Sequence, residues 1–195
     1  TLYLSPILFP ERPYHNLIKD DKILSDQLNN PLSDSLKAKE LLEDELERFK
    51  ELPENVKRAY FDLLNNNRYF HGFFDFAQYS SSRLSYLFNS KADNISDILK
   101  DMVCSKAHIS RIVDSSPTEL AYAIAIIRTG DRYSITPAWV KHQFPLVDNI
   151  IHKLRGINCG ECKYCREHLD ARKMLKRWFG YDGFTTFNGE SLQEN

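Results

Sequence analysis

Apolar residues recur every three to four positions through 33–52, with acids and lysines between them. This spacing places the apolar side chains on one face of a helix, whose start Ser33 or Asp34 can cap. A second helix is predicted over 53–67, where a proline opens the first turn and an asparagine run ends the pattern. Prolines interrupt residues 1–31 repeatedly, so we expect this segment to be extended and loop-like.

The second half of the chain carries clearer helix signals. Segment 115–130 has Ser116 as a cap, a proline in its first turn, Glu119 completing a capping box and Gly130 beyond its end. Its apolar run, 120–127, is shorter than the roughly 20 residues that a membrane span requires, so we expect a buried helix. Further helices are predicted within 95–113, 135–145 and 146–156. The pattern therefore predicts a mainly α fold.

Aromatic residues are dense in segment 68–88. Buried aromatic side chains outnumber those that stack on nucleic-acid bases, so packing into a core is the first interpretation. A platform for exposed bases is the alternative.

Composition narrows the function classes only slightly. Of 195 residues, 42% are hydrophobic and 27% charged, which fits a soluble globular chain, and the formal net charge is -1. Net charge therefore points to neither nucleic acid nor a membrane partner, and only local charge is informative. The first residues lack a charged segment before an apolar run, so we expect no secretory signal. We expect both ends to continue into a longer chain.

Three cysteines at intervals of three, Cys159, Cys162 and Cys165, carry the strongest chemical signal. A two-residue gap lets one turn bring two sulfurs to one ion, while backbone N–H groups hydrogen-bond the thiolates. Buried thiols without a ligand are the alternative. Cys104 and His168 are the candidates for a fourth ligand, and Cys104 is preferred because its lone thiol otherwise has no evident purpose.

The cysteine set suits two kinds of metal centre. Structural zinc accepts four thiolates, or three thiolates and an imidazole. A [4Fe–4S] cluster also uses three closely spaced cysteines with a remote fourth. We favour Zn²⁺, and clustered cysteines of this kind predict a reducing, cytoplasmic setting.

Segment 151–180 is locally basic, with eight Lys or Arg residues against three acids. Such an excess beside a metal knuckle suits contact with DNA phosphates, and Lys173, Lys176 and Arg177 are the candidates. The alternative is a solvated helix face.

The sequence "LKRWFGYDGF" at 175–184 resembles the opening motif of bacterial RecQ-like DNA helicases. The resemblance implies that Tyr181 stacks near the adenine of ATP and that Gln193 reads its edge, with ATP and Mg²⁺ as cofactors of the longer protein. Thr185 stands where the family has arginine, and Gln193 lies further along than in the family. The chain contains no Gly-rich Lys-Ser/Thr loop, so these residues can form only the edge of a nucleotide site. The matching positions of the motif are Phe179, Gly180 and Phe184.

The first 45 residues resemble the last third of a DEDDh 3′-5′ exonuclease of the DnaQ kind. The resemblance implies that Asp34 is the last metal-binding aspartate of a two-metal phosphodiesterase. The family's histidine position is Asn29, which cannot take a proton, so either His15 substitutes or this copy is impaired. A helix cap is the alternative role of Asp34.

The two resemblances together imply the junction of a nuclease–helicase that processes DNA in repair and recombination. The expected domains are an exonuclease tail (1–50), a helical connector (51–155), and a metal knuckle leading into a helicase (156–195). Two rival interpretations stay open. One is a non-catalytic zinc module that binds nucleic acid or a protein, and the other is a purely structural helical domain.

Overall fold

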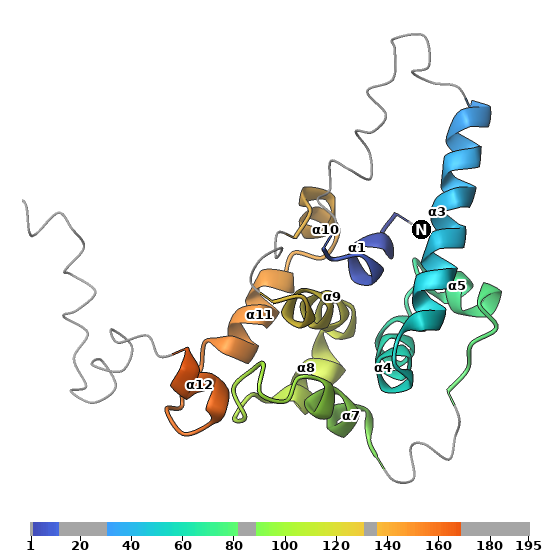
Figure 1. The fold of residues 1–195 in the computed structure, drawn as a ribbon. Helices are drawn as coiled ribbons and strands as arrows, with labels where there is room; N and C mark the ends of the chain where they lie inside the picture. Colours follow the sequence, from blue (N-terminus) through green and yellow to red (C-terminus); the bar gives the residue numbers. More distant parts are fainter. Residues whose placement is uncertain (1, 12–30, 82–88, 131–135, 169–195) are drawn as a thin grey trace, which may run out of the picture.

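The computed structural model describes residues 2–11, 31–81, 89–130 and 136–168. Within these ranges the chain forms helices and no strand, as the sequence pattern predicts (Figure 1). None of the described helices is long and apolar enough to cross a membrane. The helices are α1 Ser5–Leu8, α3 Pro31–Glu51, α4 Glu54–Leu64, α5 His71–Phe76, α7 Lys91–Ile98, α8 Ile109–Ser115, α9 Pro117–Arg128, α10 Ala138–Gln143, α11 Val147–Arg155 and α12 Lys163–Glu167.

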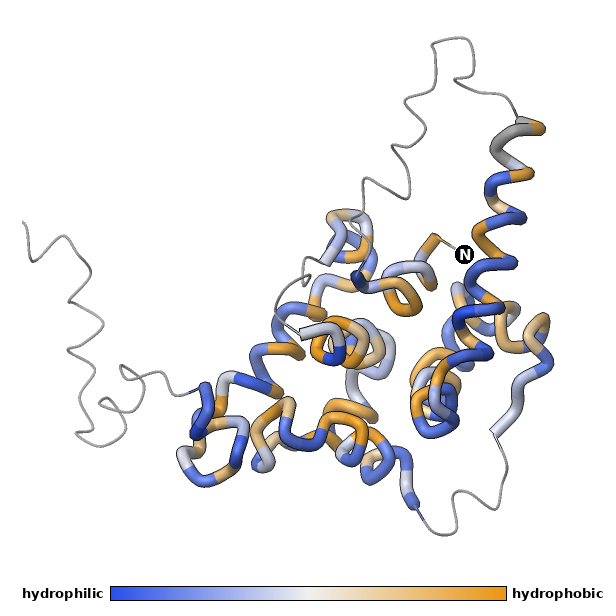
Figure 2. Tube along the Cα trace, in the orientation of Figure 1, coloured by the Kyte–Doolittle hydropathy of each residue, from blue (hydrophilic) through white to orange (hydrophobic). Residues whose placement is uncertain are grey.

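Helix α9 is the centre of the main hydrophobic core. Its residues from Leu120 to Ile127 are all buried, which confirms the predicted buried helix. Helices α1, α4, α8 and α11 pack against it, and Figure 1 shows α9 surrounded by them. Figure 2 shows hydrophobic and hydrophilic residues alternating along α3, as expected of a helix with one face turned to solvent.

The aromatic-rich segment is largely core, as the first interpretation has it. Phe70 and Phe74 are almost completely buried, and Phe49 from α3 meets Phe73 and Phe74 edge-on, with ring centroids 5.4 and 5.8 Å apart. Edge-to-face packing aligns the positive ring edge with the negative face of its neighbour. Phe76 is the exception among these described rings, with 63% of its surface exposed.

The N-terminal segment is not wholly loop-like, contrary to the prediction. Residues Ser5–Leu8 form a buried helical turn, α1, which packs on α9. Helix α1 is only four residues long, which is too short for a helical repeat of apolar residues to be recognised in the sequence. Burial of Leu4, Ile7 and Leu8 supplies the stabilisation. The hydroxyl of Tyr122 also fastens this segment by donating to the carbonyl of Tyr3.

Helix starts are the least accurately predicted features. Helix α3 begins at Pro31, so Ser33 and Asp34 lie inside its first turn and not at its cap. The capping box predicted at Ser116 is absent, since the Ser116 side chain makes no cap hydrogen bond. Ser116 ends α8 as well as starting α9, and its backbone (φ -150°, ψ 57°) serves that junction. A complete capping box forms instead between Ser90 and Asp93, at the start of α7.

Candidate metal centre

The cysteine-rich segment follows helix α11, and the end of this helix packs against loop 102–107, which is distant in the sequence. The Cys104 N–H donates to the Leu154 carbonyl (3.0 Å), and Arg155 Nε donates to the Met102 carbonyl (3.2 Å). These bonds join loop 102–107 to the last turn of α11. Gly156 then lets the chain turn away closely, because a Cβ there would lie 2.6 Å from the His152 carbonyl oxygen.

Two left-handed residues shape the knuckle, defined here as residues 157–168. Asn158 (φ 50°) and Gly160 (φ 74°) flank Cys159 and reverse the chain around its sulfur. Asparagine and glycine tolerate this conformation better than other residues. Neither residue is among the predicted site residues, although Asn and Gly on either side of a cysteine are a recognisable turn signal.

Each Cys-x2-Cys turn is closed by an N–H···S contact. The Cys162 N–H approaches the Cys159 sulfur (3.5 Å), and the Cys165 N–H approaches the Cys162 sulfur (3.4 Å). The second contact also caps the N-terminus of the short helix α12. Donors of this kind stabilise thiolates, which are the metal-binding form of cysteine.

The sulfurs of Cys104, Cys159, Cys162 and Cys165 all lie within 4.8 Å of one another. The cysteines are free thiols, and Cys162 is the most exposed of the four. Four thiolates about 2.3 Å from a central zinc would be separated by about 3.8 Å, so small side-chain adjustments complete a tetrahedron. The cysteines and Tyr164 form a hydrophobic cluster separate from the main core.

The four thiols fall into two pairs by proton affinity. Backbone N–H donation from Cys162 lowers the pKa of Cys159. Burial opposes ionisation of Cys162, but N–H groups of Ser105 and Cys165 outweigh it and lower the pKa of Cys162 to about 6. Burial raises the pKa of Cys104, and it raises the pKa of Cys165 to about 12. Cys104 and Cys165 therefore hold protons that a bound cation would displace.

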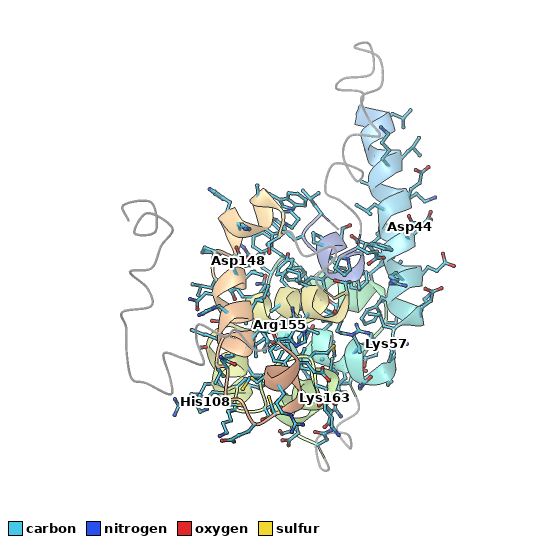
Figure 3. All side chains as sticks on the ribbon, turned by 60° about the vertical axis from the view of Figure 1, so that its left-hand side comes forward. Asp44, Lys57, His108, Asp148, Arg155 and Lys163 are labelled. Carbon is cyan, nitrogen blue, oxygen red and sulfur yellow. The ribbon has the colours of Figure 1, made fainter. Side chains whose placement is uncertain are left out.

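Charged side chains bridge the loop and the knuckle on the outside. Lys106 pairs with Glu161 (2.5 Å), and Lys163 pairs with Asp101 (3.7 Å). Figure 3 shows Lys163 in the lower part of the molecule, below Arg155. All four partners of the two ion pairs are about half exposed or more, so each pair adds little stability. Closure of the knuckle rests on the sulfurs.

His168, the alternative fourth ligand, is not part of the sulfur group. Its ring stacks on Tyr164 (centroids 4.4 Å apart, planes at 19°), and its Nδ1 lies 3.0 Å from the Tyr164 carbonyl oxygen. The Arg155 guanidinium lies 5.6 Å from the centre of the same Tyr164 ring. The structure therefore brings Cys104 to the other three cysteines and leaves His168 in a ring stack.

The side chains of the remaining predicted site residues lie outside the part of the chain that the structure describes. The backbone of Asp34 lies in the first turn of α3, and its side chain is outside the described residues. The other predicted DNA- and nucleotide-binding residues also lie outside the described ranges: Lys173, Lys176, Arg177, Tyr181 and Gln193.

Comparison of the chain with protein-family models, with curated proteins and with solved structures finds no match.

Proposed function

We propose that Cys104, Cys159, Cys162 and Cys165 bind one Zn²⁺ ion that fastens the knuckle to the helical body. The observation that carries this proposal is the convergence of four sulfurs, from two distant segments, within 4.8 Å. Four protein ligands leave no open position for water or substrate, which is typical of a structural zinc site.

Sulfur spacing favours a single ion over an iron–sulfur cluster. In a [4Fe–4S] cluster each cysteine binds a different iron, so the cluster's own edges separate the cysteine sulfurs. In a mononuclear site all four sulfurs bind one ion and lie closer together. A group within 4.8 Å fits the mononuclear arrangement. Zinc is the ion that a closed tetrahedral set of four thiolates most commonly holds.

The ion has a structural role because the knuckle has few buried residues of its own to stabilise it. Among its described residues only Asn158, Cys159, Tyr164 and Cys165 are buried, and the last three form a cluster with Cys104 apart from the main core. So small an apolar cluster cannot offset the entropy of ordering the segment. Metal binding supplies the missing free energy, as in other small zinc folds.

Metal content and two matched variants test the site. We expect about one zinc per chain by elemental analysis and no visible absorbance band after anaerobic purification. Cys104→Ser should lower the zinc affinity by orders of magnitude, whereas His168→Ala should change it by less than about threefold. A brown protein containing iron, or zinc loss in His168→Ala with zinc retained in Cys104→Ser, would contradict this assignment.

We further propose that the chain is a DNA-contacting connector within a nuclease–helicase. The support is the sequence resemblance at its two ends, together with the locally basic segment 151–180 that contains three of the four clustered cysteines. In this role the exonuclease-like part contributes Asp34, and the helicase-like part contributes Tyr181 and Gln193 at the edge of an ATP site.

Adjoining gene sequence and DNA binding test this wider role. A Gly-x-Gly-Lys-Ser/Thr-type loop is expected beyond Asn195, and an Asp-x-Glu strand motif is expected before Thr1. Replacing Lys173, Lys176 and Arg177 by Ala should weaken DNA binding and flatten its salt dependence. If both motifs are missing while DNA still binds, the chain is a zinc-binding nucleic-acid module instead.

A further inference from the structure

A groove of about 440 Å³ lies between α8 and the C-terminal end of α11, next to the metal centre. Its volume falls within the roughly 300–1,000 Å³ usual for small-ligand sites. Figure 3 shows His108 in the lower part of the molecule, below Arg155 in the last turn of α11. The residues that carry its chemistry are His108, Arg111 and Ile112 from the α8 side and His152, Lys153 and Ile157 from the α11 side.

The groove is positively charged and open to ligands. Arg111 and Lys153 are exposed, and within the described part of the chain neither forms an ion pair. The acids on the same two helices, Asp114 and Asp148, do not line it. Asp148 is already paired with Lys141, 2.7 Å away. The guanidinium and ammonium groups are therefore available to an outside anion.

The walls between these charges suit a flat ring. Ile112 lines the groove and is otherwise buried, and Ile157 is 40% exposed although it is a large apolar residue. His108 and His152 add two exposed imidazoles, which stack on bases and donate at least one hydrogen bond in either charge state. A ligand that fills the groove needs both an anionic part and a planar, weakly polar part.

We propose that this groove binds a nucleotide of single-stranded DNA, which rests on the DNA-contacting role proposed above. The phosphate lies between Arg111 and Lys153, and the base packs on Ile157 beside the imidazole rings. Duplex DNA would present its phosphates but keep its bases stacked, so the apolar wall would stay uncovered. An acidic peptide would satisfy the cations without placing a ring on that wall.

Fluorescence anisotropy with a 5′-labelled oligo-dT 15-mer tests the groove in the zinc-loaded chain. The test variant is Arg111→Gln/Lys153→Gln, and the charge-matched control is Lys50→Gln/Lys91→Gln, which alters exposed lysines on α3 and α7. We expect a loss of about tenfold or more in the test variant and less than about twofold in the control. Each lost phosphate contact should also lower the log–log salt slope by about 0.7, and therefore by about 1.4 for two.

Additional variants and competitors distinguish specific binding of single-stranded DNA from misfolding and from general charge attraction. Arg111→Lys/Lys153→Arg should keep the affinity within about threefold, and zinc content with circular dichroism verifies the fold of every variant. The single strand should bind more tightly than a duplex of equal length, and poly-glutamate should compete poorly.

Different results overturn different proposals. Equal losses in the test and control variants, or equal competition by poly-glutamate, would show general charge attraction and overturn the groove assignment. Strong DNA binding that the test variant leaves unchanged would overturn the groove while leaving the DNA-contacting role intact. No DNA binding by the unmodified chain would overturn that role, and the groove assignment with it.

Discussion

The α9-centred body and the cysteine knuckle are stabilised by different physical means. The body buries long apolar side chains around a helix that solvent hardly reaches, with Leu120, Ile124 and Ile127 almost fully covered. The knuckle buries mainly sulfur and one tyrosine. Figure 2 shows the same contrast, since α9 is largely hydrophobic in colour whereas hydrophilic residues are prominent around α12.

The difference shows where a metal becomes necessary. Burying a Leu or Ile side chain stabilises the body by about 1.5–3 kcal/mol each, and the core contains many of them. The knuckle has no comparable set of apolar residues within the described chain, so its stability depends on sulfur–metal bonds. Perturbations of the two regions should therefore be separable.

Removing a metal ligand should have the largest effect. Cys165→Ser should unfold the knuckle locally, because zinc binding to small folds has an apparent free energy of about 10–16 kcal/mol. Hydrogen exchange followed by mass spectrometry should show lost protection in the knuckle and retained protection in α9. Loss of protection throughout both regions would show that the body depends on the ion, and the distinction between the two regions would fail.

A cavity in the body should have the next largest effect. Leu120→Ala, at a fully buried position, should destabilise the chain by about 2–5 kcal/mol. Leu36→Ala is the control, because Leu36 is 53% exposed, and it should cost less than about 1 kcal/mol. Urea unfolding of the zinc-loaded proteins measures both. Equal effects would argue against an α9-centred core.

The sequence predicts the α9-centred body more completely than it predicts the cysteine knuckle. The apolar run at 120–127 predicts α9 directly, since its pattern and its burial are the same property. The cysteine spacing predicts three of the four clustered sulfurs, whereas Cys104 could be chosen over His168 only by elimination. The Ser116 capping box failed because one residue both ends α8 and starts α9. Local pattern does not encode that junction, nor the approach of α8 to α11 that forms the groove.

Acidification should weaken the knuckle's hold on metal. Burial raises the pKa values of Cys104 and Cys165, so both thiols carry protons near neutral pH and release them when metal binds. Release of at least these two protons predicts that zinc affinity falls about 100-fold or more, at least about 2.7 kcal/mol, for each unit that the pH decreases. Competition with a chromophoric chelator between pH 7 and 8 measures the slope. A slope near zero would mean that the thiols are already ionised before metal arrives.

The body should respond to pH in the opposite direction, through Glu45 on α3. The Glu45 side chain is fully buried, both of its oxygens lack a hydrogen-bond partner among the described residues, and burial raises its pKa to about 8. The folded state therefore binds a proton that the unfolded state releases near pH 4.5. This contribution to stability is present in full below that pH and is lost as the pH rises through 8.

Glu45→Gln removes this titrating group. The variant therefore tests whether the body and the knuckle respond to pH in opposite directions. Urea titrations measure the unfolding free energy at pH 5 and at pH 8, and the value at pH 8 relative to pH 5 should be lower for the unmodified chain than for the variant. The extra loss at pH 8 should be on the order of 2 kcal/mol, because relaxation and water penetration reduce the cost of a buried carboxylate. Both proteins carry the same four cysteines, so any effect of metal release at pH 5 on the unfolding free energy is the same in both. It therefore drops out when the two proteins are compared. Parallel pH profiles would show that Glu45 is solvated in the folded chain, and the body would then contribute no opposing pH response.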